Sequence, residues 1–444
     1  MENTITEQLA TYATTDHRAL YTSDDYKMAK LSVLDWIAAA YTGTSEKSTQ
    51  LILGVSCNNE TEESTLIGQN RKVSMPSAAL VNGMESHAID FDDIHDFLSL
   101  HLCSPIMPAA LAVGEKLNVS GDIFLDAIMT GVQIMVALSS GVMPEHYNIG
   151  RWHATSTLGI FGAASAAGRL LGLTKEQMQN AFGICAGLCS GIQLNFGTMS
   201  KPLVVGLAAK NGVLAAALAL KGFTGNDHIF DTDFLENIAR KTVEGKYIST
   251  RLMDKQGIHE LRFKRYPCGA PTHSGIINCK KILARHHAAV HDIDKIVFYP
   301  YPRAIRLVGI THPTTGLQGK FSIPFTAAAQ IVFGKVTIQT FTDENVRNPD
   351  VCYLLDRMEM IPDDSFTPSR GGKMVMYFKD GSVEENSTFL LGHDIDLDET
   401  MITEKEKFLE VMSTSPNKSN IDKLYEKISH LESLNNIQKL SALL

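Results

Sequence analysis

Most of the chain carries the hydrophobic periodicity of α-helices. Between residues 24 and 42, Met28, Leu31, Leu34 and Ile37 recur every third position, which predicts an amphipathic helix closed by Gly43. The same kind of reading predicts helices from residue 74 onward and over 105–117, 123–139, 155–172, 175–191, 201–221 and the last forty residues. The pattern therefore predicts a mainly α protein.

Three of these predicted helices, 155–172, 175–191 and 201–221, are unusually rich in glycine and alanine. Small side chains allow helix backbones to approach one another closely. We therefore expect a tightly packed bundle in this part of the chain.

After about residue 265 the pattern changes. Residues 295–301 read as a strand, and residues 373–391 read as a hairpin that turns at Asp380-Gly381. Helices are expected between them, over 323–333 and 348–358. The prediction is a large all-helical domain built from both chain ends, residues 1–265 and 397–444, with a smaller α+β domain over 266–396 inserted near the C-terminal end.

Composition narrows the class of protein. The 444 residues are 44% hydrophobic and 20% charged, with a net charge of −9 and no basic run, so nucleic acid is not expected as a partner. Charged and amide residues interrupt the apolar runs, and the N-terminus is polar and acidic, so neither a membrane span nor a targeting peptide is expected. The seven scattered cysteines fit reduced thiols, and we expect a cytoplasmic protein.

The densest cluster of chemically active side chains is NGMESHAIDFDDIHDFLSLHLCSP, residues 82–105. A helix through this stretch would place Asn82, Ser86 and Asp90 on one face with His87 beside them, and would crowd further acidic residues and His95 at its end. Such a cluster is often only a solvated helix end. Here the apolar segments on both sides favour burial of the cluster, and buried charged side chains need either a partner or a functional role.

Three other segments carry candidate residues. His153 lies at a helix start and would be neutral there, although such a histidine is more often structural. Lys201, after a predicted Ser200 cap, forms an anion site at a helix N-terminus, for a ligand or for an acidic side chain. Lys264 and His273 lie near the boundary between the helical domain and the insertion. Such a position suits a cleft that closes on an anion, and the alternative is a basic loop on the surface.

Together these groups fit acid–base chemistry on a small polycarboxylate. Nucleotide-binding glycine motifs are missing, and the missing Gly-x-Ser-x-Gly elbow argues against a hydrolase. A CxxC pair and a closed set of ligands with standard zinc spacing are missing too, so we expect no metal.

The chain resembles the MmgE/PrpD family over nearly its whole length. The resemblance rests on NGMESHAIDFDD, RWHATSTLGIFGAASAAGRLLGL, GTMSKPLVVGLAAKNGVLAA, KRYPCGAPTH and GKFSIPF in this order. It implies a homodimer, a helical domain with a smaller lid domain, and enzymes such as 2-methylcitrate dehydratase and cis-aconitate decarboxylase that need no cofactor. The active-site positions that it implies are Asp90, His101, His153, Lys201, Lys264 and His273.

Three departures from the family pattern stand out. One extra residue separates the acidic cluster from His101, Ile94 stands where decarboxylase-type members have threonine, and Phe325 replaces the tyrosine of the FSxxY motif. A lost hydroxyl affects specificity or proton transfer more than the fold.

The resulting hypothesis is a lyase of the dehydratase kind. Lys201 and Lys264, with His95, would bind the carboxylates of a small di- or tricarboxylate. Asp90 or His153 would remove a proton beside one of them, and His101 or His273 would protonate the leaving group or product. Decarboxylation, isomerisation or epimerisation, and a catalytically inactive carboxylate-binding protein remain as alternatives.

Overall fold

The computed structural model describes residues 4–58, 61–95, 97–390 and 396–444. The chain divides into two compact units. The helical unit comprises Met1–Ala88, Asp92–Phe263 and Asp396–Leu444, and the α+β unit comprises Ile89–Phe91 and Lys264–Ile395. The short segment Ile89–Phe91 thus groups with the α+β unit, whereas the sequence analysis assigned it to the helical domain.

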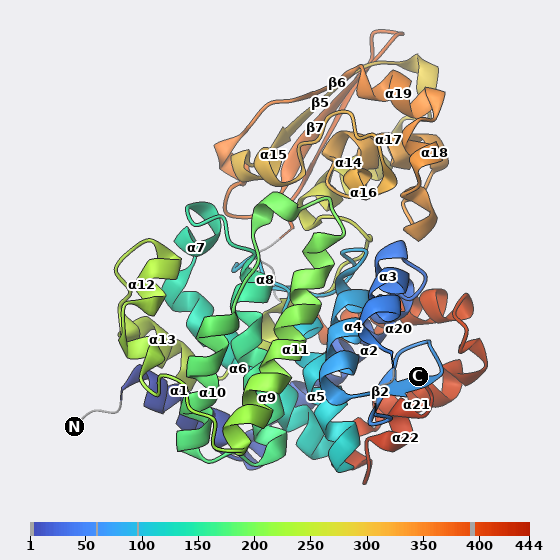
Figure 1. Ribbon diagram of the computed structural model, residues 1–444. Helices are drawn as coiled ribbons and strands as arrows, with labels where there is room; N and C mark the ends of the chain where they lie inside the picture. The colour runs from blue at the N-terminus through green and yellow to red at the C-terminus, as the bar shows by residue number, and fades with distance from the viewer. Residues whose placement is uncertain (1–3, 59–60, 96, 391–395) are drawn as a thin grey trace. The chain divides into compact units, whose positions relative to one another are not determined.

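The helical unit contains both chain ends (Figure 1). Its α-helices are α1 (Ile5–Thr14), α2 (Ser23–Gly43), α3 (Lys47–Ser56), α4 (Met75–His87), α5 (Cys103–Leu117), α6 (Gly121–Val142), α7 (Glu145–Asn148), α8 (Ala154–Thr157), α9 (Gly159–Leu171), α10 (Lys175–Leu188), α11 (Ser200–Leu220), α12 (Phe234–Ala239), α13 (Gly245–Asp254), α20 (Leu397–Ser413), α21 (Ile421–Ser429) and α22 (Gln438–Ser441). Two short antiparallel pairs accompany them: β1 (Ser64–Leu66) with β2 (Arg71–Val73), and β3 (Ile94–His95) with β4 (Leu261–Arg262). The predicted mainly α class is confirmed.

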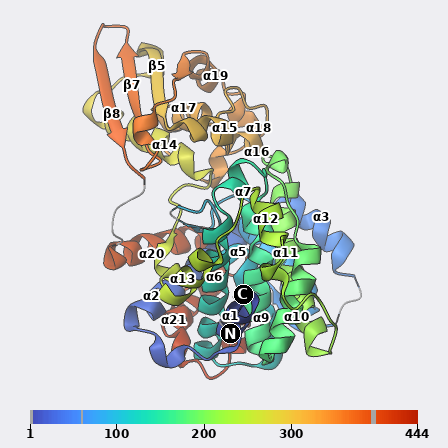
Figure 2. The same ribbon diagram turned by 90° about the vertical axis from the view of Figure 1, so that its left-hand side faces the viewer.

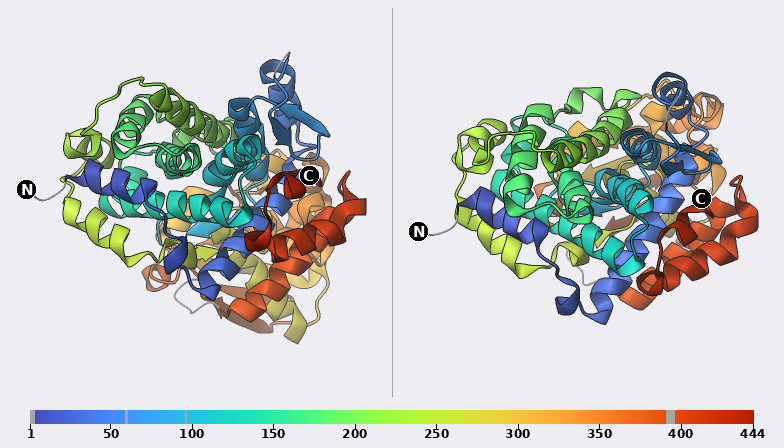
Figure 3. Two further views of the ribbon diagram at one scale, coloured as in Figure 1. Left: turned by 90° about the horizontal axis from the view of Figure 1, so that it is seen from below. Right: turned by 60° about the horizontal axis from the view of Figure 1, so that its bottom comes forward.

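Helices α6 and α11 are long and apolar enough, by length and composition alone, to cross a membrane. Lys210 and Asn211 interrupt α11 as expected, and both helices nevertheless meet this test of length and composition. Of the apolar window of α6, 89% is buried inside the protein, as in a core helix packed on α5, α9 and α13. For α11 the buried share is 50%, and its buried side packs on α4 and α9. Figure 3 looks at these helices from below.

Close helix packing follows from glycines at the crossing of α4 and α11. A Cβ atom at Gly206 would lie 2.3 Å from the carbonyl oxygen of Leu80, and one at Gly83 would lie 3.1 Å from the Cα of Gly206. Each glycine therefore lets the other helix approach. The packing places the N-terminal turn of α11, which carries Lys201, beside the end of α4.

Several predicted helix boundaries are wrong, for local reasons. Helix α4 ends at His87, and Asp90 has a left-handed backbone with φ of 60°, so Asp90 does not continue the face of Asn82 and Ser86. Ser200 is the first helical residue of α11 and not its cap. The helix expected from Thr155 or Ser156 begins instead at Ala154, with His153 in the N-cap position, and breaks before Gly159.

The α+β unit is built on a four-stranded sheet in the order β6-β5-β7-β8 (Figure 2). Its strands are β5 (Ile293–Pro300), β6 (Met358–Met360), β7 (Gly372–Phe378) and β8 (Val383–Thr388), and its helices are α14 (His273–Arg285), α15 (Pro302–Val308), α16 (Gly316–Gly319), α17 (Ile323–Phe333), α18 (Asp343–Val346) and α19 (Pro349–Leu355). Strand β5 is parallel to β6 and antiparallel to β7. The predicted hairpin is confirmed as β7–β8 with Gly381 at φ of 89°, although its expected end at residue 391 lies outside the described residues.

Candidate functional site

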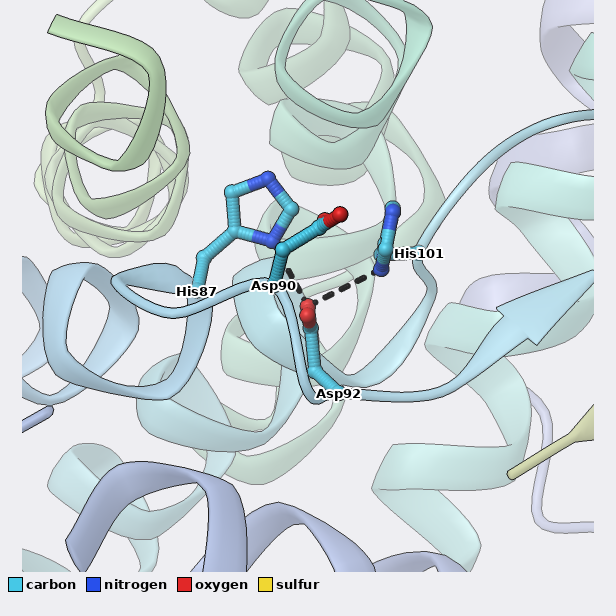
Figure 4. A group of neighbouring side chains, drawn as sticks. All are labelled: His87, Asp90, Asp92 and His101. Atoms are coloured by element: carbon cyan, nitrogen blue, oxygen red, sulfur yellow. Dashed lines mark hydrogen bonds and ion pairs between the residues drawn. The ribbon is translucent and has the colours of Figure 1, made fainter. Parts of the chain in front are cut away.

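The centre of the site in the helical unit is the carboxylate of Asp92 (Figure 4). Its Oδ2 atom lies 2.7 Å from Nδ1 of His87 and 3.1 Å from Nδ1 of His101, and it accepts a 2.6 Å hydrogen bond from Oγ of Ser104. His87 is the last residue of α4, and His101 and Ser104 lie at the start of α5. One carboxylate therefore orients two imidazoles from different parts of the chain.

Electrostatics fix the protonation of the His87–Asp92 pair. Burial opposes ionisation of Asp92, but the imidazoles of His101 and His87 hold its pKa well below the ordinary value. Burial lowers the pKa of His87 to about 4, and the nearby charge of Lys201 acts in the same direction. At neutral pH, Asp92 is therefore ionised and His87 is neutral, so Nδ1 of His87 donates to Asp92. Nε2 of His87 then carries a lone pair, and it forms no hydrogen bond with any described residue.

His153 and Lys201 lie next to this pair. The ring of His153 stacks on His87 with 5.5 Å between centroids and meets the ring of Phe196 edge-on at 5.1 Å. Nζ of Lys201 lies 5.4 Å from the centroid of Phe196. Both His153 and Lys201 are buried. The helical unit thus gathers Asp92, three imidazoles and one ammonium group.

The loop that carries His101 is fixed by buried hydrogen bonds. Asp93 accepts the backbone N–H groups of Leu102 at 2.9 Å and of Cys103 at 3.0 Å. The N–H of His101 itself donates to Oγ1 of Thr155 at 3.1 Å. Burial and the charge of Asp92 raise the pKa of Asp93 to about 7. The extra residue before His101 is accommodated in this loop, and the imidazole still reaches Asp92.

The α+β unit holds a second group of candidate residues. Nζ of Lys264 lies 3.1 Å from Oδ1 of Asp90 and donates to the Asp90 carbonyl oxygen at 2.9 Å. Nε2 of His273 lies 3.1 Å from the carbonyl oxygen of Tyr266. Burial, together with the charge of Lys264, lowers the pKa of His273 to about 3, so this imidazole is neutral. Asp90 precedes Asp92 by two residues, and the chain itself joins the two groups.

His95, predicted to bind substrate, has a different environment. It lies on β3, with Nε2 2.6 Å from a carboxylate oxygen of Glu260. Its Nδ1 accepts the N–H groups of Phe97 at 3.1 Å and Leu98 at 3.3 Å. These contacts favour a structural role for His95 in closing the loop after β3.

The group around Asp92 also has the ligand types of a metal site. The ligating atoms of His87, Asp92 and His101 lie within 4.8 Å of one another. In the structure, however, both Nδ1 atoms are engaged with Oδ2 of Asp92. A metal held through those atoms would have to replace these interactions. That no metal is required remains a prediction.

Sequence reasoning did not include His87, Asp92 or Ser104 among the site residues. His87 was placed beside the expected helical face, and Asp92 was treated as one of several acidic residues at its end. The left-handed turn at Asp90 separates Asp90 from Asp92 and directs Asp92 to the imidazoles. A histidine three residues before a cluster of aspartates was the available signal.

The departures from the family pattern fall in the hydrophobic interior and at a strand. Phe325 is fully buried on α17, with its ring 5.9 Å from that of Phe341. Ile94 pairs with Arg262 in the two-stranded ladder. An apolar ring thus stands at position 325, where the resemblance implies a tyrosine.

Two models of one protein family match the chain. Residues 7–241 match the MmgE/PrpD N-terminal domain, and residues 266–431 match the MmgE/PrpD C-terminal domain. The chain is 27% identical to human cis-aconitate decarboxylase over 348 residues, covering 75% of this chain and 71% of that protein. It is 25% identical to the cis-aconitate decarboxylase-like protein oryM of Aspergillus oryzae, covering 100% of this chain and 98% of that protein. Identity to cis-aconitate decarboxylase of Aspergillus terreus is 24%, over 95% of this chain and 92% of that protein.

Proposed function

Because the chain belongs to the MmgE/PrpD family, we propose that it is an enzyme, a lyase that acts on a small di- or tricarboxylate. The observation that carries the proposal is the buried Asp92 carboxylate shared by the imidazoles of His87 and His101. An ionised carboxylate that orients imidazoles is a general means of preparing a base and an acid.

The chemistry begins with removal of a proton from the carbon beside a substrate carboxylate. A neutral imidazole, at His153 or at Nε2 of His87, or the carboxylate of Asp90 serves as the base. The resulting enediolate carries additional negative charge, which the ammonium groups of Lys201 and Lys264 stabilise. His101, held by Asp92, or His273 then protonates the leaving group or the product.

Dehydration fits this scheme, with the acid protonating the hydroxyl that leaves as water. Decarboxylation instead forms the enediolate by loss of carbon dioxide, and the same acid then protonates the new carbanion. The relatives named cis-aconitate decarboxylase favour decarboxylation of a tricarboxylate. The absence of a hydroxyl at Phe325 removes one candidate proton donor, and both dehydration and decarboxylation need a donor at the leaving group or at the new carbanion. An isomerase or epimerase is the second candidate, because proton removal and return need only the base, the acid and the two ammonium groups.

A panel of di- and tricarboxylates, followed by proton NMR with purified protein, tests the proposal. The expected result is loss of water or carbon dioxide, or isomerisation, for at least one acid of the panel. Saturable binding of a carboxylate without any product would instead show a binding protein. Turnover that disappears on chelation and returns with a divalent metal would overturn the expectation that no metal is required.

We also propose that the protein is a homodimer. Support comes from large apolar side chains exposed on and around α10 and α11: Leu188, Ile192, Leu194, Met199, Leu214, Leu220 and Phe223. An apolar patch of this kind is typical of a protein–protein interface.

A further inference from the structure

Lys320 belongs to the GKFSIPF segment, and its side chain has no assigned role. It follows α16 and is buried, with 5% of its surface exposed. Its Nζ atom donates to the carbonyl oxygen of Ile89 at 3.1 Å and to that of Pro267 at 3.4 Å. The same ammonium group lies 4.8 Å from the ring centroid of Phe341.

These contacts surround Asp90, a residue with an unfavourable backbone conformation. Asp90 is not glycine, yet its φ is 60°. Such a conformation is unfavourable for a residue with a Cβ atom and persists only when the surroundings fix it. Lys320 binds the carbonyl oxygen before Asp90, and Lys264 binds the carbonyl oxygen of Asp90 itself. Two buried ammonium groups therefore hold the two peptide carbonyls that flank the Cα atom of Asp90.

Lys320 also connects this turn to His273. Pro267, the second acceptor of Lys320, follows Tyr266, whose carbonyl oxygen contacts Nε2 of His273. The backbone of Lys320 is fixed to the same segment, because its carbonyl oxygen accepts the N–H of Gly269 at 2.9 Å.

We propose that Lys320 is a positioning residue that holds Asp90 in its left-handed conformation and keeps the Asp90 turn in register with His273. The inference about the turn stands on geometry, and its consequence for catalysis rests on the proposed function. Lys320 acts through the backbone. Loss of its ammonium group should therefore loosen residues 89–91 and impair the chemical step more than substrate binding.

Hydrogen exchange followed by mass spectrometry tests, without any substrate, whether Lys320 holds the turn at Asp90. Lys320→Met should speed exchange of the amides in a peptide spanning 88–92 by roughly tenfold or more, the loss expected for a hydrogen bond from a charged donor. Lys281→Met, on the exposed face of α14, serves as the matched control and should leave that peptide unchanged. Lys320→Arg keeps the charge and the donors and should restore protection, which covers the case of a Met variant that folds poorly.

The consequence for catalysis is tested by steady-state kinetics with an acid that the wild type turns over. Lys320→Met should lower kcat by tenfold or more with KM changed less than threefold, and Lys320→Arg should recover part of kcat. Unchanged exchange in Lys320→Met would overturn the positioning role. An increase confined to KM would overturn it too, because it would show direct binding of a substrate carboxylate. Faster exchange in a protein whose wild type turns over no acid would support the positioning role while defeating the proposed function.

Discussion

At the residue scale, the Asp92 carboxylate organises the candidate site in the helical unit, because it contacts the imidazoles of both His87 and His101. His101, His153 and Lys201 were predicted from their motifs and lie around Asp92, and Lys264 lies against Asp90. The centre was missed because the helical pattern was extended to Asp90, whereas α4 ends at His87. No periodicity reveals a single residue at positive φ unless it is glycine.

The first residue-scale prediction concerns Lys201 as an anion site. Lys201→Met should weaken binding of a carboxylate ligand by roughly tenfold to a hundredfold, the contribution of a charge-assisted hydrogen bond. Folding should change little, since a lysine in the first turn opposes the helix dipole. Calorimetric titration and a melting curve measure both. Lys210→Met, further along the same helix, is the control, and equal affinity in the two variants would exclude the anion site.

The second residue-scale prediction concerns the buried side chain of His146. Its Nδ1 lies 2.9 Å from the carbonyl oxygen of Ile238, and its Nε2 lies 2.7 Å from Oγ1 of Thr157. Burial lowers its pKa from 6.5 to about 4. Its neutral form therefore stabilises the fold above pH 6.5, and this contribution is lost as the pH falls from 6.5 toward 4.

Urea unfolding of wild type and His146→Gln at pH 7 and pH 5 checks this sign. The variant should be less stable at pH 7, and the difference in free energy of unfolding should narrow by about 1.4 kcal/mol per pH unit below 6.5. His228→Gln, at an exposed position, should change stability little at either pH. An equal difference in free energy of unfolding between wild type and His146→Gln at pH 7 and pH 5 would contradict a lowered pKa for His146.

At the scale of elements, the sequence predicted well where hydrophobic periodicity is long. Helices α2, α5, α6, α11 and α17 and the β7–β8 hairpin were found, because each combines a buried face with a recognisable end or turn. The break between α8 and α9 was not found, although Gly159 follows Leu158 there and begins α9. There, tertiary contacts decide the chain direction.

The element-scale prediction concerns the crossing of α4 and α11. Gly206→Ala places a methyl group 2.3 Å from the carbonyl oxygen of Leu80 and should cost about 1–3 kcal/mol. Gly187→Ala on α10 meets nothing within 4 Å and should stabilise by about 0.5–1 kcal/mol. Thermal unfolding of both variants gives the comparison. If Gly206→Ala melts at or above the wild-type temperature, the close approach does not hold the helices in place.

At the scale of the whole molecule, the predicted homodimer concerns the apolar side chains around α10 and α11. Light scattering at dilute concentration should give twice the chain mass of 48.6 kDa. Leu194→Glu combined with Leu214→Glu should favour the monomer, because charge is unfavourable in an apolar interface. Val55→Glu, on the exposed side of α3, should leave the dimer unchanged. A single-chain mass for the wild type at every concentration would rule out the dimer.

Whether Asp92 and its two imidazoles support proton removal is measured most directly by incorporation of solvent deuterium at the carbon beside a carboxylate. Substrate acids would be incubated in heavy water and followed by NMR for wild type, Asp92→Asn and Ser104→Ala. The account predicts incorporation by the wild type and a rate roughly a hundredfold lower in Asp92→Asn, where the two imidazoles lose their shared carboxylate. Ser104→Ala removes only one hydrogen bond to the same oxygen and should retain most of the rate. Incorporation that is equally fast in Asp92→Asn, or turnover with no deuterium incorporated, would contradict it.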